Sequence, residues 1–302
     1  SRYTSYYSEF SALLNKVCDL TFSEISEDIF SSGILCLCEF SRKSINAYLQ
    51  VLTNVKFHEF CGQLIEHTFD SFSYIVSFLD TIFHNPKCMY RYETMHHGII
   101  NVLELYSLRN HGNNSDLLES FLCIVNAGII LLEKYINKEC DDEHLHSALH
   151  AFSMLIFNSN MVRVCLERNV HQLLFNIAFN AEISYFLHSE VFHSICTLIS
   201  TADLSDIPLF LELGFIQLVE NQVALLLKIP NAAIDALEAI VQYSSQVEGM
   251  KDIKDLIFDN EVIVSQLRYI AEHPEEITEE DGFRDCSQHA EDFLAINARI
   301  SD

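Results

Sequence analysis

Apolar residues recur at helical spacing along most of the chain, with polar residues between them. Intervals of three and four residues place apolar side chains on one helix face, as in Phe10, Leu13, Leu14 and Val17 and again in Ile34, Leu37 and Cys38. No strict alternation of apolar and polar residues is long enough for a β-strand. The pattern predicts an all-α protein.

The helical pattern also repeats at a regular interval. The segments 148–156, 191–199 and 233–241 match one another when His150, His193 and Asp235 are aligned, a spacing of about 42 residues. Self-similarity of this length is typical of stacked helical repeats, in which each repeat buries its apolar stripe against its neighbours. We therefore expect one continuous core.

A second series of matching segments precedes these helices. Three short segments align around Asn169, Gly214 and, more loosely, Asn260. Gly and Asn enter the left-handed backbone region at low cost, so each of them predicts a sharp turn between two helices. Residues 95–99 look like an earlier copy.

This arrangement resembles the armadillo repeat, in which a short first helix, a sharp turn containing Gly, a second helix and a long third helix recur. The resemblance implies a right-handed superhelical α-solenoid of armadillo or HEAT-like repeats, formed by a single domain over residues 1–302. We expect irregular or HEAT-like helices with an N-terminal cap in 1–142 and armadillo-like repeats in 143–272. Residues 273–302 would form an acidic loop and a C-terminal capping helix.

The net charge of the chain limits the classes of macromolecule that it is expected to bind. The 302 residues include 18 Lys and Arg against 43 Asp and Glu, a formal net charge of −25. This charge repels phosphate backbones and anionic lipid, so we predict no nucleic-acid partner and no membrane partner. It favours a basic partner, and it is also consistent with a charge that only keeps a large solenoid in solution.

Ten cysteines are scattered along the chain without any C-x-x-C pair. Disulfide frameworks and zinc ribbons need clustered spacing, so buried free thiols in a reducing compartment are expected, which predicts a cytoplasmic or nuclear location. The longest apolar stretch, residues 122–132, is interrupted by Asn126. It is shorter than the ~20 residues of a membrane span and favours a buried helix.

No combination of residues typical of a catalytic site is recognisable. The chain has no G-x-S-x-G and no H-E-x-x-H motif, and its eight glycines are too dispersed to form a phosphate-binding loop. The sequence therefore predicts that the protein is not an enzyme and needs no cofactor. An enzyme with an unrecognised site stays as a third hypothesis.

Histidines raise a metal hypothesis. Asp142, His146 and His150 are spaced by four residues, so they share one helix stripe on which two imidazoles could bind zinc. Against it, Asp142 lies near a helix start, where a negative charge is favourable, and only three ligands are visible. The pair His96 and His97 fits a polar turn better than a metal site. We predict no metal site.

A comparison with the importin-α type of armadillo protein gives candidate binding residues. In that family the third helices carry a Trp and, four residues later, an Asn, which together hold an extended basic peptide. The corresponding pairs here lack both residues, and the chain has no Trp. If the concave groove still binds a partner, the residues facing it should be His146, His150, Met154, Ser189, His193, Thr197, Asn231, Asp235 and Ala239. Packing between neighbouring third helices is the alternative role for each of them.

The sequence thus favours a non-catalytic scaffold or adaptor that binds a protein partner, either an extended or basic segment in the groove or another folded subunit along a flank. A divergent cargo adaptor of the nuclear-transport type is the alternative. A homodimer is also possible, because Tyr3, Tyr6, Tyr7 and Phe10 form an aromatic cluster near the N-terminus that either associates or packs on the second helix.

Overall fold

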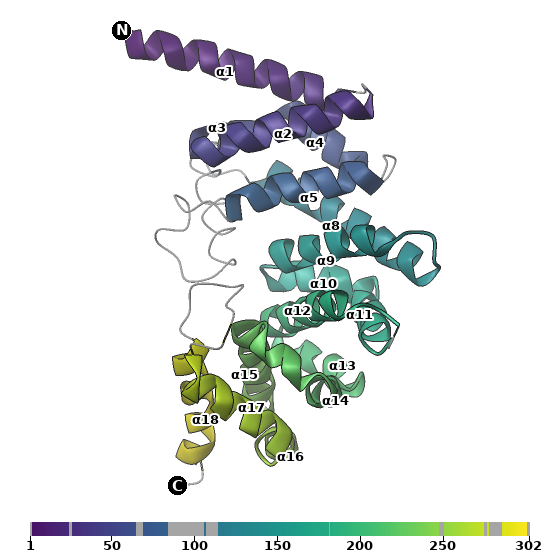
Figure 1. The fold of residues 1–302 in the computed structure, drawn as a ribbon, viewed down its shortest axis with the longest axis vertical. Coiled ribbons are helices and arrows are strands. Elements are labelled where there is room, and N and C mark those ends of the chain that lie inside the picture. Colours follow the sequence, from purple (N-terminus) through teal and green to yellow (C-terminus); the bar gives the residue numbers. More distant parts are fainter. Residues whose placement is uncertain are drawn as a thin grey trace. The chain divides into compact units, whose positions relative to one another are not determined.

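The computed structural model describes residues 2–23, 26–64, 69–83, 106, 114–180, 182–247, 251–274, 277 and 286–300 (Figure 1). Within these residues every regular element is a helix and none is a strand, which confirms the all-α prediction. The chain divides into two compact units, Ser1–Leu155 and Ile156–Asp302. The predicted repeat copy at 95–99, with His96 and His97, lies outside the described residues, as does the acidic run 278–281.

The first unit stacks helices on one another. Its described helices are α1 (Arg2–Thr21), α2 (Glu27–Lys43), α3 (Ile45–Leu52), α4 (Val55–Gly62), α5 (Phe69–Phe83), α8 (Ser115–Ile136) and α9 (Asp142–Leu155). Helix α2 packs on α1, α3 and α5, while α8 and α5 both pack on α9. The largest side chains that these contacts bury include Tyr48, Phe57, Phe78, Phe121 and Phe152. Each such side chain stabilises the fold by about 2–3 kcal/mol.

Helices α3, α4 and α5 follow the order of two short helices and a longer one. The breaks between them are made by caps: Ser44 accepts a hydrogen bond from the Ala47 amide, and Asn54 accepts one from the Lys56 amide. The sequence predicts irregular or HEAT-like helices here, and that assignment stays a prediction. Asn54 caps the start of α4 through its side chain, so this break leaves no Gly-type turn signal in the sequence.

Helix α8 is long and apolar enough to cross a membrane by length and composition. Just over half of its most apolar window, 56%, is buried inside the structure. Its fully buried residues Leu117, Phe121, Ile124, Val125 and Leu132 lie at intervals of three, four and seven, on the side that packs against α4, α5 and α9. The helix therefore fits the core helix that residues 122–132 predicted.

The second unit repeats the three-helix order. Its helices are α10 (Ser159–Glu167), α11 (Val170–Ala178), α12 (Tyr185–Thr201), η2 (Leu204–Asp206), α13 (Ile207–Glu212), α14 (Phe215–Asn221), η3 (Val223–Leu227), α15 (Pro230–Gln246), α16 (Lys251–Phe258), α17 (Glu261–Glu272) and α18 (Cys286–Ile300). The long helices α12 and α15 are the predicted third helices, and they pack on each other. The first predicted third helix, α9, belongs to the other unit. The boundary between the units, after Leu155, therefore falls inside residues 143–272, which were expected to form one run of armadillo repeats. The single-domain assignment stays a prediction.

Two of the three predicted sharp turns have left-handed backbone. Asn169 has φ 58° between α10 and α11, and Gly214 has φ 89° between α13 and α14. Asn260, between α16 and α17, instead has φ −76°, and its side chain accepts hydrogen bonds from the amides of Val262 and Ile263. The third turn is therefore made by an N-cap and not by left-handed backbone.

Candidate partner-binding surface

The third helices bring some of the predicted groove residues to accessible positions and bury others. In the first unit His146 and His150 of α9 are half-buried, and in the second unit His193, Asp235 and Ala239 are half-buried. Their role in binding stays a prediction.

Four predicted groove residues need correction. Met154, Ser189, Thr197 and Asn231 are buried, so their side chains do not lie on an open surface. Met154 and Thr197 each lie four residues after a half-buried histidine, at the place where importin-α type repeats present Asn. Here the apolar or methyl-bearing side chains at these positions pack in the interior instead.

A row of polar contacts links α5 to α9 in the first unit. His150 Nε2 donates a hydrogen bond to Asp80 Oδ1 at 2.8 Å, and the hydroxyl oxygens of Ser73 and Ser147 are 2.8 Å apart. Asp80 and Ser73 belong to α5, and His150 and Ser147 belong to α9. The two helices thus contact each other through these polar positions.

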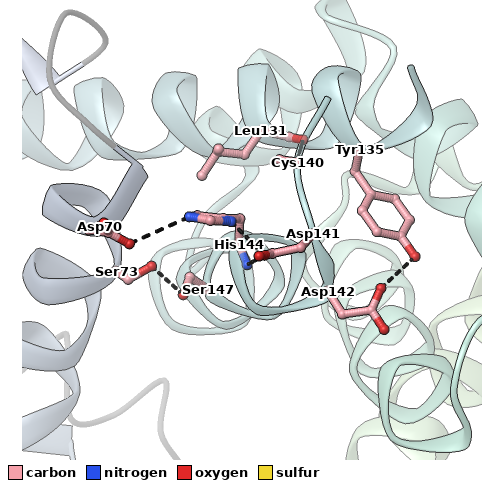
Figure 2. A network of polar contacts seen from close by, with 9 residues as sticks. All are labelled: Asp70, Ser73, Leu131, Tyr135, Cys140, Asp141, Asp142, His144 and Ser147. Atoms are coloured by element: carbon pink, nitrogen blue, oxygen red, sulfur yellow. Dashed lines mark hydrogen bonds and ion pairs between the residues drawn. The ribbon is translucent and has the colours of Figure 1, made fainter. Parts of the chain in front are cut away.

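Figure 2 shows the start of this row, where His144 lies between Asp70 of α5 and Asp141. Its Nδ1 is 2.5 Å from Asp141 Oδ1, and its Nε2 is 3.7 Å from Asp70 Oδ1. The backbone amide of His144 also donates to Asp141, which lowers the pKa of that carboxyl group. The aspartate therefore stays ionised and caps the first turn of α9.

The zinc hypothesis at Asp142, His146 and His150 is not supported by their contacts. Asp142 Oδ1 accepts a hydrogen bond from the Tyr135 hydroxyl at 3.0 Å (Figure 2), and His150 is bound to Asp80. Burial, followed by the bond to Asp142, raises the pKa of Tyr135 to about 12. Among the described residues these three do not form a group with metal-ligand spacing.

In the second unit α18 lies against α15 at two predicted groove positions. His289 of α18 is buried, with its Nδ1 3.0 Å from Asn231 Oδ1 and its Nε2 3.4 Å from Asp235 Oδ1. Glu238 Oε1 lies 3.5 Å from the same Nε2. Sequence reasoning missed Glu238 and His289. The three-residue step from Asp235 to Glu238 was a visible signal, but nothing in the sequence connected either acid to a histidine so far along the chain.

Helix α12 carries a stripe that the sequence reasoning recognised only in part. Phe186 and Glu190 precede His193 by seven and three residues, so the three side chains share one side of the helix. Phe186 is 54% exposed, while Glu190 and His193 are half-buried. An aromatic ring and a carboxylate on one accessible stripe can hold the stem and the charge of a basic side chain. The neighbouring Tyr185 ring already has the Lys228 ammonium 5.8 Å from its centre.

A polar hollow of about 580 Å³ lies on the first unit, at α1, α3 and α4. It is lined by Ser11, Asn15, Asp19, Gln50, Thr53, Asn54, Val55 and Lys56. The Gln50 amide donates to the Ser11 carbonyl at 2.7 Å and to Asn15 Oδ1 at 2.8 Å. Asn54 donates to Asp19 at 3.2 Å. These groups join the helices to one another, so the hollow has a structural explanation.

Several buried thiols are poor nucleophiles. Burial raises the pKa of Cys18 and of Cys165 to about 12, and that of Cys196 well above its usual value. A thiol with such a pKa is protonated at neutral pH and does not attack substrates. These cysteines behave as small apolar residues of the core.

Comparison with known proteins identifies the fold. No protein-family model matches the chain, and no curated protein sequence matches it. Among solved structures, a designed armadillo repeat protein in complex with the peptide (KR)4 has a TM-score of 0.58 at 12% identity, covering 93% of this chain and 99% of that chain. A second designed armadillo repeat protein gives 0.59 at 10% identity, covering 93% and 98%. An engineered protein gives 0.55 at 13%, covering 93% and 97%.

The likeness at these identities establishes the fold. The chain is an all-α, armadillo-like repeat solenoid, as its repeat pattern predicted. Armadillo repeats typically serve as protein-binding scaffolds and typically lack catalytic activity.

Proposed function

We propose that this chain is a non-catalytic scaffold or adaptor that binds an extended, basic segment of a protein partner along α12. The observation that carries the proposal is the accessible stripe of Phe186, Glu190 and His193 on a third helix. The ring supplies a face for a lysine or arginine stem, and the carboxylate supplies the opposite charge.

Two further facts support a basic ligand. The net charge of −25 attracts cations over long range. A designed protein with a similar fold is in complex with the peptide (KR)4. That ligand belongs to the designed protein, and it serves here as a chemically suitable probe.

The test is a binding titration of fluorescent (KR)4 peptide with the purified chain. We expect saturable binding that weakens at least tenfold between about 50 and 300 mM salt, because screening removes long-range attraction. Glu190→Lys should weaken binding by about tenfold or more. Glu220→Lys on α14 makes the same change in net charge at a residue outside the stripe, so it serves as the matched control.

The control variant distinguishes binding at the α12 stripe from attraction by the overall negative charge. An equal loss in both variants would mean that only the overall charge attracts the peptide, and no binding by the unmodified chain would exclude a basic segment as ligand. A loss confined to Glu190→Lys supports α12 as the surface.

The nuclear-transport type of adaptor is the less supported alternative. Its Trp and Asn positions are replaced throughout, and Met154 and Thr197 at two Asn positions are buried. A peptide bound here would thus need other backbone partners. A cytoplasmic or nuclear location remains part of the proposal and is supported by the free thiols of the described cysteines; fluorescence microscopy of a tagged chain tests it.

Self-association is a separate proposal. Phe10 packs on Phe40 of α2 with ring centres 5.4 Å apart, which supports packing on the second helix for this residue. The side chains of Tyr3, Tyr6 and Tyr7 lie outside the described residues. Light scattering at several concentrations tests for a dimer.

A further inference from the structure

The C-terminal helix places a buried histidine against two carboxylates of α15. We propose that Asp235, Glu238 and His289 form a binding site for one divalent transition-metal ion such as Zn²⁺, which ties α18 to α15. The ligand atoms all lie within 4.8 Å of one another.

The protonation of His289 is the first argument. Its Nδ1 faces Asn231 Oδ1 at 3.0 Å, and an amide oxygen only accepts hydrogen bonds, so Nδ1 carries the proton. Nε2 has no hydrogen-bond partner, and the His289 side chain is fully buried (0% exposed). A lone pair on Nε2 would be repelled by the two carboxylates that it faces unless a proton or a metal ion lies between them. The distances separate these two cases.

Distance is the second argument. Charge-assisted hydrogen bonds from nitrogen to carboxylate are about 2.7–2.9 Å long, but Nε2 lies 3.4 Å from Asp235 Oδ1 and 3.5 Å from Glu238 Oε1. Zinc bonds of about 2.0–2.1 Å place two ligands of a tetrahedral site about 3.3 Å apart. The observed separations therefore fit atoms that share an ion better than atoms that share a proton.

The ligand types select the kind of ion. An imidazole with two carboxylates suits zinc and its neighbours, whereas magnesium and calcium prefer oxygen ligands alone. The Asp235 and Glu238 side chains are 38% and 35% exposed, so ions can reach the site and water can complete the coordination. The hydrogen bond from Nδ1 to Asn231 is the kind of outer contact that orients a metal-binding histidine.

The test is calorimetric titration of the metal-stripped full chain with ZnCl2. We expect one zinc per chain at this site, and Asp235→Asn or Glu238→Gln should weaken its binding by at least tenfold. Glu220→Gln on α14 is the matched control and should bind as the unmodified chain does. Both ligand variants keep the size of the side chain, and the helix content of each is checked by circular dichroism.

Thermal unfolding gives an independent readout. Excess zinc should raise the Tm of the unmodified chain by about 5 °C or more, and magnesium at the same concentration should raise it much less. The shift should be clearly smaller in Glu238→Gln at the same zinc concentration. Zinc binding and Tm shifts that are the same in both ligand variants and the unmodified chain would overturn the proposal, as would no binding at all. These outcomes do not depend on the peptide experiment.

Discussion

The two units each pair a histidine with an acid at a repeat position, but the pairs differ. In the first unit His150 and Asp80 are 2.8 Å apart and are 24% and 31% exposed. In the second unit the buried His289 faces Asp235 and Glu238 at 3.4 and 3.5 Å. The first pair is a complete hydrogen bond near solvent. The second leaves a buried nitrogen unsatisfied, which is why it fits an ion and the first does not.

The largest expected effect concerns the stability contributed by the two histidines. His289→Ala should lower the free energy of unfolding by about 2–4 kcal/mol, since it leaves a cavity and removes a buried hydrogen bond to Asn231. His150→Ala should cost about 1 kcal/mol or less, because a partly exposed pair contributes little. Denaturant titration of both variants measures the difference; equal losses would contradict the comparison.

Metal removal gives the next effect. A chelator should lower the stability of the zinc-loaded chain by up to about 2.7 kcal/mol when zinc was present at a hundredfold excess over its Kd. Asp80→Asn in the first unit should leave this loss unchanged, while Asp235→Asn should reduce it to about 1.4 kcal/mol or less at the same zinc concentration. Loss of the zinc effect in Asp80→Asn but not in Asp235→Asn would contradict the assignment of the zinc site to the second unit. Denaturant titration with and without chelator measures each loss.

Glycines in the two units should respond with opposite sign. Gly214 has φ 89°, and an added Cβ would lie 3.3 Å from Gln217 Oε1, so Gly214→Ala should cost about 1–2 kcal/mol. Gly62 ends α4 in the first unit with open space around it, so Gly62→Ala should stabilise by about 0.5–1 kcal/mol. Thermal unfolding of both variants checks the sign.

Acidic pH should produce the smallest change in stability. Burial lowers the pKa of His58 in the first unit and of His171 and His188 in the second, from a usual value of 6.5. Near His58 the charge of Asp116 partly opposes this shift. Such histidines bind protons more readily in the unfolded chain. The stability of the folded chain is therefore highest above pH 6.5 with respect to these groups, and it declines as the pH falls through and below that value.

The measurement is the Tm between pH 5 and 8. We expect His171→Gln to flatten the acid side of the profile, because it removes a histidine whose pKa is lowered by burial. A profile that stays steep in His171→Gln would contradict the role of that residue.

Much of the architecture could be predicted from the sequence alone. Helical spacing is a local property, so the all-α fold followed from the apolar pattern, and the turns at Asn169 and Gly214 followed from backbone preference. The third helices around His193 and Asp235 followed from self-similarity. The three-helix order at α3 to α5 did not, since Asn54 begins α4 as a side-chain N-cap and leaves no signal of a left-handed turn.

Only the tertiary structure decided which of these residues meet and which are covered. Sequence periodicity gives a helix face but not the neighbour that packs on it, so Met154, Thr197 and Asn231 were expected on a surface and are buried. For the same reason His289 could not be joined to Asp235 and Glu238: their contact depends on α18 folding back onto α15, and local spacing carries no information about contacts between residues so distant in the chain.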